Sequence, residues 1–370
     1  METTEIRMPA HLFSPSLNRR SFLKAAGSGL AASVVAAPFI SRAHARGPLR
    51  ISNFGGFFEQ AFADGVYPEF TKGTGIPVQS IPQASGGQFL VQLAQAVQSG
   101  SAPMDICCAG QVEVLRGRQQ KLWKTIETNE LANVANVPER YMFASDTGVD
   151  GIGAMGWYLS FIADPTRVDP LPTSWKELWG EREGAWGVYG GGASPIMDIT
   201  SAIYFDGPQT LRTTEGIDAV LGKVAELRSK AALWWTEEGT MQSAFQNGEV
   251  LGGMYYHDVA MIMKGEGTSL ESIFPEEGAL QGYNGWCVPA SNEMTDEIKA
   301  FLDWSATPEC HQAIARKVLA APLLPRSMLD LTDQEFAAVA TEAESILLDP
   351  LPKVEHADYL AQQFLAVVAS

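Results

Sequence analysis

The sequence has few of the residue patterns on which catalysis and metal binding usually depend. Its 370 residues include four cysteines and five histidines, and no two cysteines have the C-x-x-C spacing of a metal site. There is no G-x-S-x-G nucleophile elbow, no H-E-x-x-H pair and no P-loop. The sequence therefore predicts neither a hydrolase triad nor a nucleotide site, and we expect no metal and no other cofactor.

The few cysteines and histidines are expected to be structural. Cys107 and Cys108 are adjacent in "MDICCAG", which is typical of a buried strand in which thiols act as small hydrophobes. A disulfide between Cys287 and Cys310 stays open at this point. His311 stands early in a predicted helix, and we expect it at the surface or as a helix cap.

One glycine-rich motif is present, the G-x-G-x-x-G of residues 151–156. A dinucleotide site requires a helix after this motif. Here it continues into "WYLSFIAD", which has the character of a strand. We interpret it as a glycine-rich strand where the chain passes between two lobes.

Basic residues are also scarce. The chain has a formal net charge of −17, and its first 45 residues hold five Lys or Arg and two Asp or Glu. The remainder has 21 basic and 41 acidic residues, a net charge of −20. Such a surface is a poor partner for nucleic acid or an anionic membrane, so we expect neither.

No long hydrophobic run is present, since the apolar stretch at residues 25–40 is shorter than the about 20 residues of a membrane span. Arg19 and Arg20 precede this stretch, and the segment ends in Ala43-His44-Ala45. Twin arginines before a mildly apolar core and an A-x-A site are typical of a cleaved Tat-type export signal. We therefore expect residues 1–45 to be a signal peptide and the protein to be periplasmic.

Strand and helix patterns alternate after this signal, as in "LRISNF", "GGFFEQAFADGVYPEF", "IPVQSIP" and "GGQFLVQLAQAVQSG". This order predicts an α/β fold with parallel strands covered by helices. About 325 residues exceed the usual size of a single core, so two lobes are expected. We assign residues 46–153 and 284–320 to lobe I, and residues 154–283 and 321–370 to lobe II.

Aromatic and polar side chains follow several predicted strands. In open α/β sheets, ligands bind beyond the carboxyl ends of the strands, against helix N-termini. Two such lobes facing each other would enclose a ligand cleft lined by these loops. The candidate ligand-binding residues are Phe54, Phe57, Gln111, Asp198, Tyr256, Asp258, Tyr283, Asn284 and Trp286.

Several segments together resemble the periplasmic solute-binding proteins of ABC importers, most closely the spermidine/putrescine-binding branch. They are "EFTKGTGIPV", "LPTSWKELW", "FQNGEVLGGMYYHD" and "YNGWCVPASN", and they cover most of the chain after the signal. The resemblance implies a type II periplasmic binding protein fold with the ligand cleft between two lobes. It also implies delivery of a solute to a membrane permease with its ATPase, and no catalysed reaction. We expect a monomer.

The resemblance carries over to individual residues in part. Phe54 and Phe57 stand in the loop whose aromatic residues contact polyamines in the family, and Tyr256 matches a family tryptophan. At the places of a second tryptophan and of an acidic residue this sequence has Gly282 and Asn284, which leaves a polyamine open. Tyr283, Trp286, Asp198 and Asp258 would provide a different aromatic and acidic lining for an amine.

Two alternatives remain. The first is an exported enzyme on the same scaffold, because a fold does not determine function. The second is a ferric-ion-binding protein, since related proteins hold iron through adjacent tyrosines and this chain has Tyr255 and Tyr256. In those proteins the pair lies about two residues further on, where His257 and Asp258 stand here. We therefore expect Tyr256 and Asp258 to face an organic solute and Tyr255 to turn into the lobe.

Overall fold

The protein is built on an eleven-stranded mixed sheet covered by helices, as the alternating sequence pattern predicts. The computed structural model describes residues 47–84, 86–191 and 195–369, so the predicted signal at residues 1–45 lies outside the described residues. The sheet has the order β2-β1-β3-β10-β5-β8-β6-β7, while β4 and β9 pair with β5, and β11 pairs with β10. The strands are β1 (Leu49–Phe54), β2 (Val78–Gln83), β3 (Ile106–Gly110), β4 (Met142–Ser145), β5 (Gly148–Ala163), β6 (Trp186–Tyr189), β7 (Ala231–Trp235), β8 (Gly252–Tyr256), β9 (Glu271–Ile273), β10 (Leu280–Cys287) and β11 (Ile346–Leu347).

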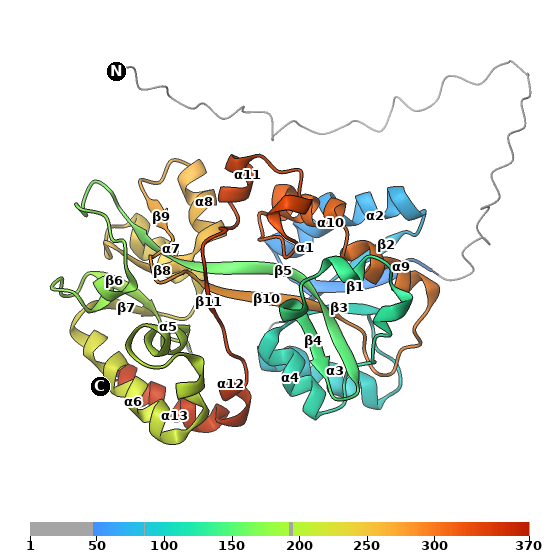
Figure 1. Ribbon diagram of the computed structural model, residues 1–370, viewed down its shortest axis with the longest axis horizontal. Coiled ribbons are helices and arrows are strands. Elements are labelled where there is room, and N and C mark those ends of the chain that lie inside the picture. Colours follow the sequence, from blue (N-terminus) through green and yellow to red (C-terminus); the bar gives the residue numbers. More distant parts are fainter. Residues whose placement is uncertain (1–46, 85, 192–194, 370) are drawn as a thin grey trace, which may run out of the picture. The chain divides into compact units, whose positions relative to one another are not determined.

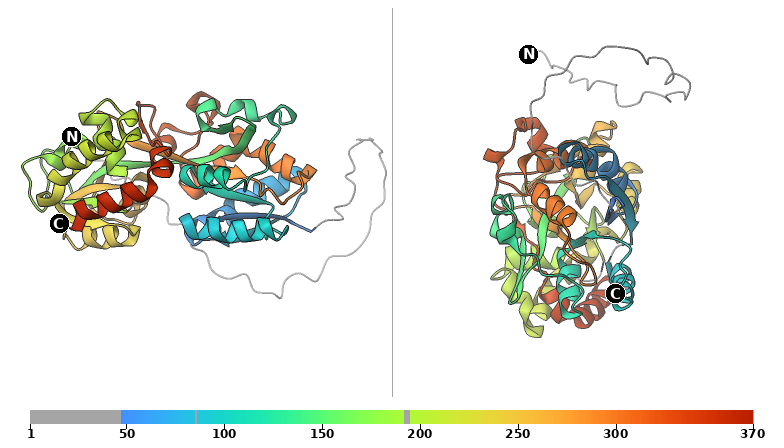
Figure 2. Two further views of the ribbon diagram at one scale, coloured as in Figure 1. Left: turned by 90° about the horizontal axis from the view of Figure 1, so that it is seen from below. Right: turned by 90° about the vertical axis from the view of Figure 1, so that its right-hand side faces the viewer.

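Several helices begin after a threonine whose side chain caps them. Thr213 accepts a hydrogen bond from the N–H of Gly216 at 3.1 Å, and Thr295 accepts one from Ile298 at 3.3 Å. The C-terminal helix, red in the left-hand view of Figure 2, packs against α6. The helices are α1 (Phe57–Ala61), α2 (Tyr67–Thr74), α3 (Gly86–Gln98), α4 (Gln111–Gln119), α5 (Pro195–Tyr204), α6 (Thr214–Val224), α7 (Glu238–Gln246), α8 (His257–Gly265), α9 (Asp296–Ser305), α10 (Pro308–Ala313), α11 (Asp333–Ala337), α12 (Pro352–Glu355) and α13 (Ala357–Ala369). Among the helices of the described residues, none has the length and apolar character needed to cross a membrane.

Strands β5 and β10 join two groups of parallel strands (Figure 1). They pair with each other in antiparallel register from Leu280 opposite Leu159 to Cys287 opposite Gly151. Strand β10 also pairs with β3 of the first group, and β5 pairs with β8 of the second. The glycine-rich motif at residues 151–156 lies within β5, which confirms that it is a strand.

Glycine in this strand allows close packing rather than phosphate binding. A Cβ added to Gly153 would lie 2.7 Å from Cδ1 of Leu323 and 2.9 Å from the carbonyl oxygen of Tyr141. Gly156 exchanges backbone hydrogen bonds with Ala321 at 2.8 and 3.0 Å. The segment after η8 (Ile314–Val318) therefore packs directly against β5.

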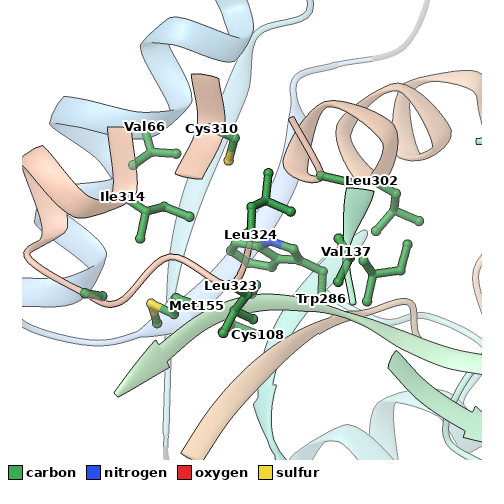
Figure 3. Close-up of a cluster of buried hydrophobic side chains, with 14 of the residues drawn as sticks. Val66, Cys108, Val137, Met155, Trp286, Leu302, Cys310, Ile314, Leu323 and Leu324 are labelled. Atoms are coloured by element: carbon green, nitrogen blue, oxygen red, sulfur yellow. The ribbon is translucent and has the colours of Figure 1, made fainter. Parts of the chain in front are cut away.

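The two largest core clusters lie toward opposite ends of the crossing strands β5 and β10. The first, drawn in part in Figure 3, surrounds Trp286, whose ring meets Phe62 at 5.7 Å and Phe301 at 5.2 Å, both edge to face. Each such pair contributes about 0.5–1.5 kcal/mol beyond the burial of its area. The second cluster includes Phe161, Trp175, Trp186, Ile217 and Phe364. Separate cores of this kind are what a two-lobe protein requires.

The packing of the C-terminal segment bears on where one lobe ends. The first cluster contains Leu323, Leu324, Val339 and Ala340 together with Phe301. The predicted boundary placed all residues after 320 in lobe II. We keep the two-lobe division as a proposal and move the last crossing to a point after Ala340.

The four cysteines are free and buried, so the disulfide considered between Cys287 and Cys310 is absent. Cys310 belongs to the first cluster, whereas Cys287 packs in a third cluster with Phe89 and Trp123. Cys107 and Cys108 are fully buried in β3, as predicted. Burial raises the pKa of all four thiols, which keeps them protonated.

Two histidines are buried, and one of them differs from the sequence expectation. His311, predicted at the surface, is fully buried, and its Nδ1 accepts a hydrogen bond from the N–H of Leu323 at 3.3 Å. Burial lowers the pKa of His311 to about 3 and that of His257 to about 4. Both imidazoles are therefore held neutral in the folded protein.

We expect the free energy of unfolding to fall as the pH is lowered. Because the folded-state pKa values lie below the ordinary 6.5, the unfolded chain takes up these protons first, and stability is lost from about pH 6.5 down through pH 4 and 3. His311→Asn, which keeps an acceptor for Leu323, should flatten this loss in urea unfolding at pH 7.5, 5.5 and 4.5. His356→Asn on the half-buried third histidine serves as control. If the free energy of unfolding of His311→Asn falls with pH as steeply as that of the native protein, the prediction is wrong.

Candidate ligand-binding site

A cavity of about 710 Å³ opens at the carboxyl ends of the strands in both groups. The last residue of each of five strands lines it, namely Phe54, Gly110, Tyr189, Trp235 and Tyr256. The first residues of four helices line it as well, namely Gly86, Gln111, Pro195 and Glu238. This is the place where open α/β sheets bind ligands.

The chain places its own carboxylates at these helix starts. Glu113, Glu238 and Asp258 lie in the first turns of α4, α7 and α8, and all three line the cavity. Helix N-termini carry a partial positive charge that attracts anions. Because carboxylates of the chain already stand there, the cavity does not offer these N-termini to an anionic ligand.

Asp258 has a buried and only partly compensated carboxyl group. It follows β8 at the start of α8, and its Oδ1 is buried with no hydrogen-bond partner among the described residues. Burial raises the pKa of Asp258 to about 7, and the neighbouring Glu238 carboxylate adds to the rise. A positive charge placed beside Asp258 would relieve both effects.

Aromatic rings line the same cavity as this carboxyl group. The ring of Tyr256 meets Trp157 at 5.8 Å and Trp235 at 6.1 Å, and Trp235 meets Tyr189 at 4.7 Å. All of these contacts are edge to face. Rings held by one another in this way offer their faces to a cation or to apolar carbon at little entropic cost.

The adjacent tyrosines point apart. Tyr255 is fully buried and its hydroxyl donates to the carbonyl oxygen of Glu238 at 3.2 Å, so it turns into the lobe as expected. Tyr256 lines the cavity, and burial raises the pKa of its hydroxyl. The two phenols therefore do not form a chelating pair. Within the described ranges, no three His, Cys, Asp or Glu side chains gather as a metal site either.

Residues 66–327 match the family described as bacterial extracellular solute-binding protein. This chain belongs to that family.

Relatives of this solute-binding protein include the spermidine/putrescine-binding periplasmic protein of Escherichia coli K12. The two are 21% identical over 258 residues, which cover 69% of this chain and 72% of the relative. An ABC transporter substrate-binding protein from Bradyrhizobium japonicum has a TM-score of 0.73 at 14% identity, with 87% and 99% of the two chains covered. The PBP MotA from A. tumefaciens B6 in complex with glucopine has a TM-score of 0.69 at 17% identity, with 87% and 99% covered. These structures show the predicted two-lobe periplasmic binding protein fold.

The structure brings most of the predicted residues of the solute-binding protein to one cavity. Gln111 is held in place, since its Oε1 accepts the N–H of Tyr283 at 3.0 Å and its Nε2 donates to the carbonyl oxygen of Leu348 at 3.3 Å. The predicted residues that line the cavity are Phe54, Gln111, Tyr256, Asp258, Tyr283 and Asn284.

Two predicted residues lie elsewhere, and one cannot be placed. Trp286 is fully buried in the first cluster, because β10 runs antiparallel to β3 and places it opposite Cys108, inside the sheet. Asn284 lies opposite Gly110, the end of β3 that lines the cavity. Asp198 is fully buried behind the cavity, where it accepts a hydrogen bond from Nζ of Lys353 at 2.5 Å. The side chain of Phe57 lies outside the described part of the chain.

Several cavity residues were missed from the sequence. Trp235 and Glu238 stand at a strand end and the next helix start, so the rule used for Asp258 would have found them. Trp157 opens the predicted strand "WYLSFIAD", where a single aromatic residue is more simply explained as core. Lys353 and Arg116 gave no sequence signal, since they meet only in the fold, where Nη2 of Arg116 donates to the carbonyl oxygen of Lys353 at 3.1 Å.

We expect Asp258→Asn to stabilise the ligand-free solute-binding protein at pH 8. A carboxyl group whose pKa is raised in the folded state binds its proton more tightly there, so its cost to stability grows as the pH rises from about 4 through 7. The amide removes this cost, which should add about 1 kcal/mol or more at pH 8 and little at pH 5. Denaturant unfolding of both proteins at the two pH values measures the difference. Loss of stability at pH 8 would contradict it.

Removing the ammonium group of Lys353 should have the opposite effect. Lys353 is 4% exposed and its partner Asp198 is 0% exposed, so Lys353→Met leaves a buried carboxylate without its cation. We expect a loss of about 3–5 kcal/mol in urea unfolding at pH 7. The double variant Asp198→Asn/Lys353→Met should recover part of it. Equal stability of the two variants would show that the pair is not the cause.

Proposed function

We propose that this protein is the solute-binding component of an ABC importer and that it captures a cationic, amine-bearing organic solute of the polyamine type. It would act as a monomer in the periplasm, after export directed by residues 1–45, and deliver the solute to a permease and its ATPase. The observation that carries the choice of solute is the Asp258 carboxyl group, which lines the cavity together with aromatic rings and has a buried oxygen without a hydrogen-bond partner among the described residues. An ammonium group bound there would supply the missing charge.

The charges around the cavity support a cation. Its lining includes four carboxyl groups, those of Glu113, Glu237, Glu238 and Asp258, against the side chains of Arg116 and Lys353. The Lys353 ammonium is already neutralised by Asp198. The cavity is therefore acidic overall, and lobes closing over a positive charge would gain electrostatic energy that a neutral solute does not provide.

The relatives differ in the solute they are named for or were solved with, so the choice of solute rests on the residues of the cavity. One is named for spermidine and putrescine, and another was solved with glucopine. At two places where the polyamine-binding branch has a tryptophan and an acidic residue, this chain has Gly282 and Asn284. Glu238 and Trp157 stand in the same cavity and provide a carboxylate and an indole from other elements.

Thermal unfolding against a solute panel tests this proposal. We expect 1,4-diaminobutane, spermidine or a related amine at a hundred times its dissociation constant to add about 2.7 kcal/mol, which raises the midpoint by several degrees. Neutral sugars and ferric citrate should leave it unchanged. Chromatography of the recovered amine should show it chemically intact, whereas an altered product would favour the exported-enzyme alternative.

Asp258→Asn should weaken binding of the amine tenfold or more, about 1.4 kcal/mol, in calorimetric titration. Asp146→Asn removes the same charge from an exposed position outside the cavity and serves as matched control. Equal affinity of the two variants would remove Asp258 from the binding site.

A further inference from the structure

Trp157 is the one residue that is not fully buried in a long buried stretch of the crossing strand β5. Every residue of β5 from Asp150 to Ala163 is buried apart from Trp157, which is half-buried. Its ring lines the cavity and meets Tyr256 edge to face at 5.8 Å. A large aromatic ring that stays partly uncovered at the junction of two core clusters forms part of the floor of the cavity.

The ring lies where Gly282 has no side chain. In the register of β5 with β10, Gly282 is directly opposite Trp157. A Cβ added to Gly282 would lie 2.1 Å from Cζ2, 2.5 Å from Cε2 and 2.7 Å from Cη2 of Trp157. Any residue other than glycine at this position would therefore displace the indole.

The backbone does not itself require glycine here. Gly282 does not adopt a positive φ angle, unlike Gly252 and Gly253 in β8, with φ angles of 159° and 133°. It is buried and does not line the cavity. The glycine at position 282 leaves space for the indole of Trp157, so the two residues act as a pair.

We infer that Trp157 is the specificity-determining aromatic residue of the cavity and that Gly282 positions it. The inference rests on the proposed function, since it concerns the same cavity. The indole face packs against the carbon chain of the amine, and the ring sets how deep a solute can lie between the lobes. Because β5 crosses between the two groups of strands, this contact belongs to neither group alone.

Calorimetric titration of the purified protein with the α,ω-diamines from 1,3-diaminopropane to 1,6-diaminohexane tests the inference. Trp157→Ala should weaken the best-bound diamine tenfold or more, and Trp157→Phe should retain most of the affinity because a smaller ring remains. Trp157→Ala should also shift the preference toward a longer diamine, since the floor is lowered. Gly282→Ala should change the preference as well, although it adds one methyl group that does not itself reach the cavity.

Gly222→Ala is the matched control, because a Cβ there meets nothing within 4 Å. Thermal unfolding of each variant shows whether it is folded. If the native protein binds diamines and both Trp157→Ala and Gly282→Ala keep its affinity and its chain-length preference, the inference is overturned while the proposed function stands. If the folded native protein binds none of the diamines, the proposed function fails and this inference fails with it.

Discussion

The architecture depends on glycines in β5 and β10. Because these residues have no Cβ atom, other side chains pack directly against the backbone of the two strands. A Cβ on Gly153 would meet Leu323, one on Gly285 would lie 2.2 Å from Phe143, and one on Gly282 would meet Trp157. These glycines on β5 and β10 let other segments of the chain and aromatic side chains pack directly against the strands that cross between the two core clusters. The cavity floor, the position of the C-terminal segment and the joining of the two sheet halves all follow from that contact.

A second constraint lies at the helix starts. Glu113, Glu238 and Asp258 place carboxyl groups in the first turns of helices that begin at the cavity. Such groups normally stabilise a helix, yet one carboxyl oxygen of Asp258 is buried with no hydrogen-bond partner in the described part of the chain. A polar group left uncompensated in the free protein is a cost to stability that ligand binding can recover, and sites of this kind are where natural proteins depart from maximal stability.

The sequence predicted the features that depend on residues close to one another in the chain. Alternating periods predicted the strands and helices, and the junction of β8 with α8 located Tyr256 and Asp258, because a strand end followed by a helix start is visible in the chain itself. It failed where the outcome depends on register or distant contacts. Trp286 is buried by the register of β10 with β3, which no sequence pattern shows, and Trp157 resembles core until Gly282 is seen opposite it. The Asp198–Lys353 pair joins residues 155 positions apart, and His311 is buried by a segment that follows its own helix.

The four enclosed thiols have a consequence for experiments on this protein. Each is buried and each is held protonated by its surroundings, so alkylating reagents and oxidants find neither access nor a thiolate while the chain is folded. They are distributed over the first and third clusters, which pack on opposite faces of β3 and β10 in the half of the molecule that contains β1, β2 and β3. The rate at which Cys107, Cys108, Cys287 and Cys310 are labelled would therefore report how often that half of the molecule opens. The measurement needs no engineered probe and does not change the ligand cavity.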